Sequence, residues 1–562
     1  MSRPGNGSAV KITFLGGLGE IGRNCACIEV NGRILLLDVG LMFPELDMLG
    51  IDLVLPDFTY LRDNAERIDG AIITHGHEDH MGGLSYLLRD LSFPIYGSAL
   101  SLGLARNRIE EAGLLDRTEL IPVRDGERRW IGPCEVEFIP VTHSVPHGFA
   151  TAFHTPQGVI LHSGDFKLDL TPVDGRLTDL ARIGALASGE GIRLLLSDST
   201  NADEPGHARS ESSVGQVLYN LFHQHEGRRI VIACFASHIH RVQQIADAAV
   251  SFGRKVATLG LSMKKNVRLA REMGLLRIPD HALVDIDDVR DLPPGEVCVI
   301  STGSQGEPMS ALSLMAQRNN RWLEITADDT VILSSHPIPG NEMNVSKVID
   351  GLVRLGAEVV HSGLSDVHAS GHAKQEELKT LLSIVRPDWF VPVHGEYRHM
   401  VAHAKLARGM HAVGDGADDH VLVCTDGDQL VLDDDGLRLA GQVPAGYLFV
   451  DGIIGDVGQG VLRDRRVLAD EGVVVVVVTV DVNTGAILVG PEVITRGWVY
   501  APEAEPLLNE CADAVRQAVK EAFAKGAVEI EALQRVVRRA AGKFVNDSTK
   551  RRPMIVPVVM EA

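Results

Sequence analysis

The fold is decided by one short stretch, Thr74-His75-Gly76-His77-Glu78-Asp79-His80-Met81-Gly82-Gly83. It follows an expected buried strand at 71–74 and carries three histidines and a carboxylate in an H-x-H-x-D-H pattern. Imidazole and carboxylate groups are ligands that zinc and manganese accept. His75 and His77 lie two positions apart in extended chain and can face one ion. Asp79 and His80, where the loop turns into a helix, can face a second, so the stretch predicts a two-metal site. The alternative, a chance histidine-rich surface loop, fits poorly because 22 histidines among 562 residues rarely bunch this way.

The H-x-H-x-D-H pattern resembles the signature of the metallo-β-lactamase superfamily. That resemblance implies an αββα sandwich with one or two metals at one sheet edge. It also implies two further ligands, each following an expected strand. His143 would complete the first metal, and Asp165, in Ser163-Gly164-Asp165, would bridge both ions. His147 is nearby but lies beyond a proline and fits less well.

The closing motifs come unusually late in the chain. Leu196-Ser197-Asp198-Ser199-Thr200 is followed by about 170 residues of α/β sequence before His372 and His394 appear. This arrangement resembles the β-CASP nucleases, which carry an inserted domain at this point. The resemblance makes Asp198 the acidic motif, His372 the middle histidine and His394 the last ligand of the second metal. The implied metal ligands are His75, His77, Asp79, His80, His143, Asp165 and His394.

Within the β-CASP proteins, three segments and an extra C-terminal domain are similar to the ribonuclease J family. The segments are Leu15–Asn24 (LGGLGEIGRN), Gly40–Pro44 (GLMFP) and His368–His372 (HASGH). The expected architecture is α/β throughout. It comprises a metallo-β-lactamase domain in two parts (1–211 and 368–450), an inserted β-CASP domain (212–367), a linker (451–467) and a small C-terminal oligomerisation domain (468–562).

This resemblance implies a hydrolytic mechanism with two zinc ions, or manganese as the alternative. A hydroxide held between the ions would attack the phosphodiester in line. His372 would act as the general acid for the leaving 3′ oxygen, because a histidine titrates near neutrality. Asp198 would orient His372 or a ligand, and Asp79 would help to move the proton besides ligating a metal. A helix-capping role is the alternative for His372.

The expected substrate is RNA with a 5′ monophosphate. The residues that would bind it are His368, Ala369, Ser370, Gly371 and His372, with Ser237, His240 and Ser304 from the β-CASP domain. Such a pocket predicts 5′→3′ exonuclease activity together with internal cleavage, in the maturation of ribosomal RNA and the decay of messenger RNA. The alternatives are a DNA nuclease or small-ester hydrolase on the same fold, and a metal-free scaffold protein that binds RNA without cleaving it.

Composition limits the partners and the compartment. The net charge is −21, from 54 basic and 75 acidic residues, which excludes non-specific binding of nucleic acid through overall charge. RNA contact therefore needs a local basic groove. The seven cysteines are scattered, so we expect reduced thiols in a cytoplasmic protein. We expect neither a secretory leader nor a membrane span, because the longest apolar runs are too short.

The C-terminal part predicts association. A valine-rich strand at 472–480 should bury both faces, and at a sheet edge it would pair with another chain. We therefore expect a dimer or tetramer, with an RNA-degradation complex as a further partner. The family resemblance also implies a structural cation, calcium, bound by the carbonyls of Leu49 and Ile51 with Asp451.

Overall fold

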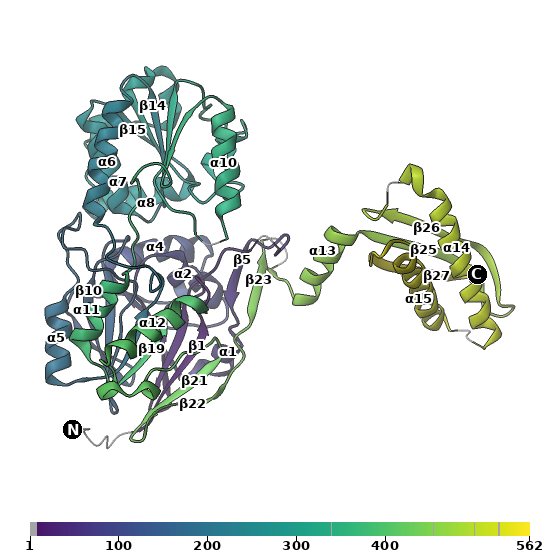
Figure 1. Ribbon diagram of the computed structural model, residues 1–562, viewed down its shortest axis with the longest axis horizontal. Helices are drawn as coiled ribbons and strands as arrows, with labels where there is room; N and C mark the ends of the chain where they lie inside the picture. The colour runs from purple at the N-terminus through teal and green to yellow at the C-terminus, as the bar shows by residue number, and fades with distance from the viewer. Residues whose placement is uncertain (1–7, 46, 339, 453–454, 500, 527–528) are drawn as a thin grey trace. The chain divides into compact units, whose positions relative to one another are not determined.

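The computed structural model describes residues 8–45, 47–338, 340–452, 455–499, 501–526 and 529–562. The chain divides into two compact units (Figure 1). The first holds the chain up to Phe43 together with Leu53–Leu448, and the second holds Pro44–Asp52 and Phe449–Ala562.

Two mixed sheets pack face to face in the first unit. The larger has the order β22-β21-β1-β3-β4-β6-β7-β8 and the smaller β19-β13-β12-β11-β10-β9. The strands of the larger sheet are β1 (Val10–Gly16), β3 (Cys25–Val30), β4 (Arg33–Leu37), β6 (Ile68–Ile73), β7 (Ile95–Gly97), β8 (Leu120–Pro122), β21 (Asp428–Asp433) and β22 (Gly436–Gln442). Those of the smaller are β9 (Arg128–Ile131), β10 (Cys134–Val141), β11 (Gly148–Thr155), β12 (Gly158–His162), β13 (Ile192–Asp198) and β19 (Trp389–Val393). Ile12 and Leu35 from one sheet share a buried core with Phe138 and Phe153 from the other.

Helices cover the outer faces of these sheets. The smaller sheet is covered by α5 (Leu180–Gly189), α11 (Gln375–Val385) and α12 (Tyr397–Met410), whose Leu186, Leu382 and Ala404 are buried against it. The helix α4 (Ala99–Glu111) contacts β7 and β8 of the larger sheet. The predicted αββα sandwich is confirmed.

The inserted domain is a parallel sheet with helices on both faces (Figure 1). Its order is β15-β16-β14-β17-β18, built from β14 (Arg229–Ala233), β15 (Lys255–Leu259), β16 (Val297–Ser301), β17 (Asp329–Leu333) and β18 (Glu358–His361). One face is covered by α6 (Glu211–Gln224), α7 (Ile239–Ser251) and α8 (Leu261–Glu272), and the other by α9 (Ala311–Ala316) and α10 (Glu342–Arg354). The domain interrupts the smaller sheet between β13 and β19, which pair in parallel with Asp198 opposite Val393.

The second unit is built on a three-stranded sheet of order β26-β25-β27, with β25 (Val473–Asp481), β26 (Ala486–Arg496) and β27 (Met554–Glu561). Its helices are α13 (Gln459–Glu471), which begins in the range expected as linker and ends four residues beyond it, α14 (Ala501–Ala524) and α15 (Ile530–Thr549). The expectation that β25 buries both faces is wrong. Val474, Val476 and Val478 are fully buried with α14 and α15, whereas the alternate residues on the other face are only half-buried. Nor is β25 an edge, since it lies between the other two strands.

Among the described residues, none of the helices combines the length and the hydropathy needed to cross a bilayer.

Candidate metal centre

The loop after β6 carries four candidate ligands, and Asp38 holds it in place. The backbone N–H and the hydroxyl of Thr74 both donate to the Asp38 carboxylate at 2.8 Å. His80 Nδ1 lies 2.7 Å from Asp38 Oδ2. Because a carboxylate only accepts, Nδ1 is the donor and His80 Nε2 keeps its lone pair for the site.

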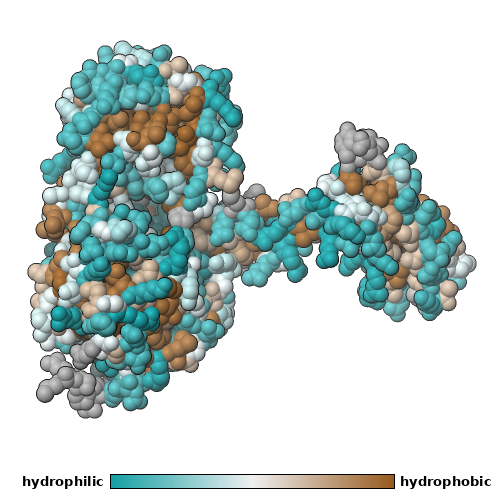
Figure 2. Space-filling model, viewed as in Figure 1, coloured by the Kyte–Doolittle hydropathy of each residue, from teal (hydrophilic) through white to brown (hydrophobic). Residues whose placement is uncertain are grey.

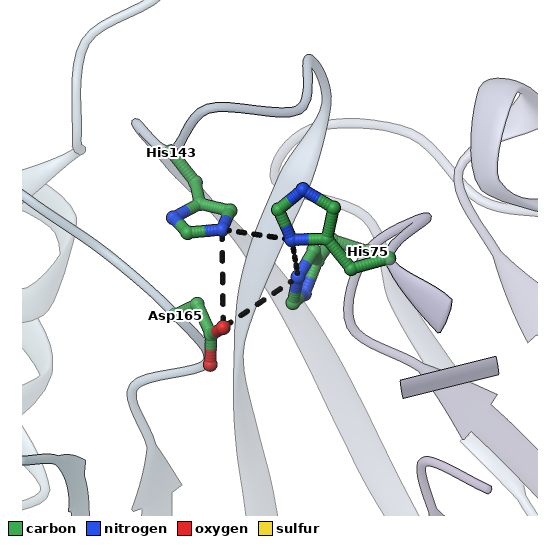
Figure 3. Close-up of side chains that lie close together, drawn as sticks. His75, His143 and Asp165 are labelled. Atoms are coloured by element: carbon green, nitrogen blue, oxygen red, sulfur yellow. Dashed lines mark hydrogen bonds and ion pairs between the residues drawn. The ribbon is translucent and has the colours of Figure 1, made fainter. Parts of the chain in front are cut away.

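The first group of converging ligand atoms comes from His75, His77, His143 and Asp165, within 4.8 Å of one another. Figure 3 shows His75 and His143 beside the Asp165 carboxylate. His77 Nδ1 lies 3.0 Å from His75 Nε2 and 3.1 Å from His143 Nε2. Three imidazole nitrogens, two of them on fully buried side chains, and a carboxylate oxygen are a donor set that zinc accepts, so these residues fit the metal that the family resemblance implies.

The second group comes from Asp79, His80, Asp165 and His394. Asp165 Oδ2 lies 3.2 Å from His80 Nε2 and 3.6 Å from His394 Nε2. Within the part of the chain that the structure describes, His394 Nε2 is buried and has no hydrogen-bond partner, as expected of an atom reserved for a metal. Asp165 belongs to both groups, which is the geometry that a bridging carboxylate requires. All seven residues predicted as ligands therefore meet in one place.

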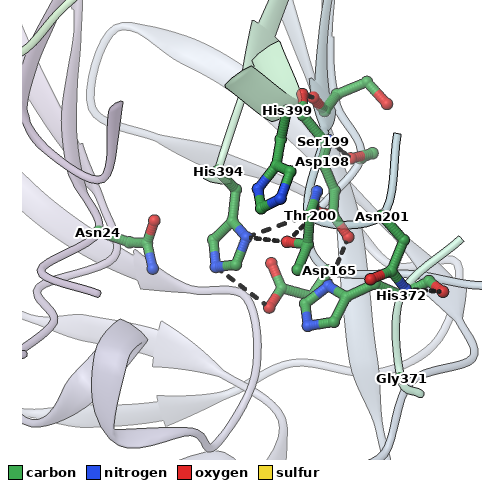
Figure 4. A network of polar contacts seen from close by, with 12 residues as sticks. Asn24, Asp165, Asp198, Ser199, Thr200, Asn201, Gly371, His372, His394 and His399 are labelled. Atoms are coloured by element: carbon green, nitrogen blue, oxygen red, sulfur yellow. Dashed lines mark hydrogen bonds and ion pairs between the residues drawn. The ribbon is translucent and has the colours of Figure 1, made fainter. Parts of the chain in front are cut away.

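A hydrogen-bonded network around Asp198 adjoins these ligands (Figure 4). Asp198 Oδ2 lies 2.7 Å from His372 Nδ1. The Thr200 hydroxyl lies 2.8 Å from Asp198 Oδ1 and 2.7 Å from His394 Nδ1. The hydroxyl has one proton and donates it to the carboxylate, so His394 Nδ1 must be the donor and Nε2 the free nitrogen. Asp198, His372 and His394 also form a compact group of their own, but the Nδ1 atoms of the two histidines are engaged in these hydrogen bonds.

Burial and charge lower the pKa of some site histidines and raise that of others, with His80 and His394 raised as well as His372. Burial, with the neighbouring imidazoles, holds the pKa of His75 and of His143 well below the ordinary value, which keeps them neutral and able to ligate. Burial also lowers the pKa of His77, to about 4. For His372, burial lowers the pKa, but the Asp198 carboxylate outweighs it and the net pKa is raised. His372 is therefore suited to carry a proton.

Two partners of the ligands were not predicted from the sequence alone. Gly371 accepts a hydrogen bond from His143 Nδ1 at 2.7 Å through its carbonyl, which leaves Nε2 free for the metal. Asn24 donates from its side-chain amide to the Asp79 carbonyl at 3.0 Å, which gives the LGGLGEIGRN segment a role beside the second group. Asn24 stood in a quoted motif, whereas nothing in the sequence singled out the bond to His143.

Thr200 and Asp38 were also missed as partners. Thr200 lay in the motif quoted for Asp198 but was given no role of its own. Asp38 follows the apolar strand β4, and a carboxylate at the end of a buried strand is a signal that could have found it.

The expected phosphate-binding residues occupy two neighbouring regions. The Ser370 hydroxyl accepts from the Asn201 side-chain amide at 2.8 Å, and His368 Nδ1 is buried with no hydrogen-bond partner among the described residues. Ser237 and Ser304 follow β14 and β16, so they lie at the carboxyl edge of the parallel sheet. His240 instead faces Asp174, with its Nε2 3.2 Å from the carboxylate.

The residues implied for a structural cation already have a cationic partner. Arg465 Nη1 donates to the Leu49 carbonyl at 3.1 Å, and Nη2 donates to Asp451 Oδ2 at 2.7 Å. A guanidinium therefore uses two of the oxygens that calcium would need. Arranged in this way, Leu49, Ile51 and Asp451 do not fit a bound calcium ion.

Comparisons with known proteins agree with this architecture. Residues 18–202 match the metallo-β-lactamase superfamily, 227–352 the ribonuclease J β-CASP domain, 357–421 the Zn-dependent metallo-hydrolase RNA specificity domain, and 460–562 the ribonuclease J C-terminal domain. A crystal structure of a protein of unknown function from Enterococcus faecalis V583 superposes with a TM-score of 0.53 at 15% identity, over 76% of this chain and 100% of that one. That likeness concerns the fold alone.

The fold and the site define a metallo-hydrolase of the metallo-β-lactamase superfamily with a β-CASP insertion. Ribonuclease J 1 of Streptococcus pyogenes is 41% identical over 98% of this chain and 97% of its own length. Ribonuclease J2 of Bacillus subtilis is 39% identical over 99% of both chains, and ribonuclease J of Mycobacterium tuberculosis 41% over 99% and 98%. The chain belongs to the ribonuclease J family. The predicted class of enzyme, a metal-dependent ribonuclease, is confirmed.

Proposed function

We propose that this ribonuclease removes nucleotides from 5′-monophosphate ends in the 5′→3′ direction and also cleaves internally. One contact carries the proposal: the loop His368–His372, expected to hold a terminal phosphate, touches His143 of the first ligand group through Gly371. A 5′ phosphate bound in that loop lies beside the metal centre, so the next phosphodiester along the chain reaches it. An enzyme built in this way acts at the end of the chain.

The metals are proposed to be two zinc ions, with manganese as the alternative. His75, His77 and His143 would hold the first, Asp79, His80 and His394 the second, and Asp165 would join both. Two such ions would supply an activated water and offset the charge that builds on the phosphate. The side chains that hold them are preset for this, since hydrogen bonds from Nδ1 of His80, His143 and His394 leave each Nε2 free.

His372 is proposed to give a proton to the leaving 3′ oxygen. Its Nδ1 is bound to Asp198, so in the charged ring Nε2 carries the proton to be donated. Asp198 both orients the ring and raises its pKa. Asp79, besides ligating, lies 3.5 Å from His394 Nε2 and helps to move protons at the site.

The test compares RNA bearing a 5′ monophosphate, the same RNA bearing a triphosphate, and matched DNA, each with Zn²⁺ or Mn²⁺ supplied. The expected result is stepwise release of mononucleotides from the monophosphate RNA, with slower attack on the triphosphate form. His80→Ala should abolish cleavage, while His223→Ala, a change at an exposed histidine of α6, should not. The proposal fails if RNA survives, if DNA is preferred, or if RNA is bound but not cut.

A second copy of the chain is proposed to cover the open face of the C-terminal sheet, giving a dimer or tetramer. Val475 and Val477 lie on the face of β25 that α14 and α15 leave uncovered, opposite Val556 and Val558 of β27. Ile494, opposite Val475 on β26, is 40% exposed. Apolar residues reach the surface of this unit (Figure 2). An uncovered apolar sheet face of this kind favours association.

We further propose that the enzyme works in the cytoplasm, in ribosomal RNA maturation and messenger RNA decay, with an RNA-degradation complex as partner. All seven cysteines are described, buried and free. Unpaired thiols suit a reducing compartment.

A further inference from the structure

A strap formed by residues 367–373 connects the β-CASP domain to the metal centre. At its start, the Val367 carbonyl accepts hydrogen bonds from Arg241 Nη1 at 2.8 Å and from the Ser334 hydroxyl at 2.7 Å. At its end, the Ala373 N–H donates to the Phe166 carbonyl at 2.7 Å, one residue after Asp165. The strap is therefore anchored in the inserted domain on one side and beside the bridging carboxylate on the other.

The middle of the strap sets the orientation of a metal ligand. His143 Nδ1 lies 2.7 Å from the Gly371 carbonyl, and their hydrogen bond points Nε2 at the first ligand group. A Cβ atom on Gly371 would lie 2.6 Å from His143 Cε1, closer than real contacts allow. The position of the strap and the orientation of His143 are thus set together.

The same strap carries the proposed phosphate-binding groups. The Ser370 hydroxyl and the neighbouring N–H groups come directly before Gly371 and His372, and the Asn201 amide holds both Ser370 Oγ (2.8 Å) and the His372 carbonyl (3.0 Å). A phosphate on these groups and a metal on His143 favour one and the same arrangement of the strap. Two ligands that favour one state bind cooperatively, and their coupling is reciprocal.

We propose that binding of a 5′ phosphate at the strap raises the affinity of the first ligand group for its metal ion. The hydrogen bond between Gly371 and His143 transmits the effect. This inference rests on the proposed function, because it takes the strap as the phosphate site. On this inference, binding of a 5′-monophosphate end of RNA strengthens metal binding at the first ligand group.

The experiment measures zinc affinity of the full-length enzyme by equilibrium competition with a chromophoric chelator. Uridine 5′-monophosphate is the probe and uridine the control without phosphate. With the monophosphate present, one of the two zinc ions should bind about fivefold more tightly, or more, than with uridine. The His143→Ala variant, which should lose the first ion, identifies that ion as the one affected. Because coupling is reciprocal, removing zinc should weaken binding of the nucleotide by the same factor, as measured by calorimetry.

Variants separate the strap from direct contact between nucleotide and metal. Gly371→Ala should lose the coupling, whereas Gly409→Ala, whose Cβ would meet nothing within 4 Å, should keep it. Ser370→Ala provides a second route if Gly371→Ala does not fold. Because it removes one of the strap groups that hold the phosphate, it should weaken nucleotide binding and lower the gain in zinc affinity at saturating nucleotide, whereas direct contact between nucleotide and metal would leave that gain unchanged.

The inference is overturned if the nucleotide binds without changing zinc affinity, or if the coupling persists in Gly371→Ala. It is also overturned if Ser370→Ala keeps the full gain in zinc affinity at saturating nucleotide. If the nucleotide does not bind even to the zinc enzyme, the proposed 5′-phosphate pocket fails and the inference falls with it. The first three outcomes leave the proposed function standing, so the two failures can be told apart.

Discussion

Replacing Thr200 with valine should weaken metal binding by the second ligand group while leaving the fold intact. The hydroxyl bridges Asp198 Oδ1 (2.8 Å) and His394 Nδ1 (2.7 Å), and valine keeps its shape without its oxygen. Of the partners that the described residues offer, His394 Nδ1 then keeps Asp198 Oδ1, at 3.4 Å. A hydrogen bond to a charged group contributes about 1.5–3 kcal/mol, and about 1.4 kcal/mol is a tenfold change in affinity. We therefore expect the second ion to bind about 10–100-fold more weakly, the range typical of lost partners behind metal ligands.

The assay for this prediction counts bound zinc by mass spectrometry after dialysis against graded chelator. Thr200→Val should release one of two ions at a lower chelator concentration and lose RNA cleavage in parallel. Thr200→Ser keeps the hydroxyl and should restore both. The reasoning is refuted if Thr200→Val retains both ions with unchanged affinity, or if Thr200→Ser is as impaired as the valine variant.

Three further predictions concern stability and assembly. Arg241→Met leaves the buried Glu211 without the guanidinium that lies 2.6 Å from it. This should lower the free energy of unfolding by about 3–5 kcal/mol and lower the melting temperature of the unit that contains both residues. An unchanged melting curve would contradict this. Val475→Lys with Val556→Lys should dissociate the proposed oligomer in analytical ultracentrifugation without unfolding the C-terminal unit, and a persistent oligomer would place the interface elsewhere. Burial lowers the pKa of His403 to about 3, so its stabilising contribution is present above pH 6.5 and is lost as the pH falls toward 3. At pH 5 the loss is about 2 kcal/mol, and His403→Gln should flatten the acid limb of the stability profile, measured by denaturant titration.

The sequence contained most of the metal site because the ligands are ordered along the chain. His75, His77, Asp79 and His80 lie in one loop, and the others each follow a strand. Their hydrogen-bond partners were harder to find, because they act through distances that only the folded chain sets. The bond from His143 to the Gly371 carbonyl joins residues 228 positions apart, and neither residue type signals it.

The valine-rich strand shows the same limit for the fold. Composition gave β25 correctly as a strand, but six valines do not reveal how many of its faces are covered. The two helices that follow β26 both pack on one face, on Val474, Val476 and Val478, and leave the other open. That choice depends on the paths of α14 and α15, not on the strand itself.

The inserted domain raises a physical problem that Arg241 helps to solve. Strands β13 and β19 must pair across about 190 intervening residues for Asp198 and His394 to meet. Arg241 binds Glu211, where the inserted domain begins, at 2.6 Å, and the Val367 carbonyl, where it ends, at 2.8 Å. With the two ends of the domain held together, the loop that must close to pair β13 with β19 has an effective length of about 35 residues. By the logarithmic dependence of loop closure on length, this saves about 1.5 kcal/mol of chain entropy. A buried guanidinium at the base of the insertion thus helps to bring the last candidate metal ligand to the first.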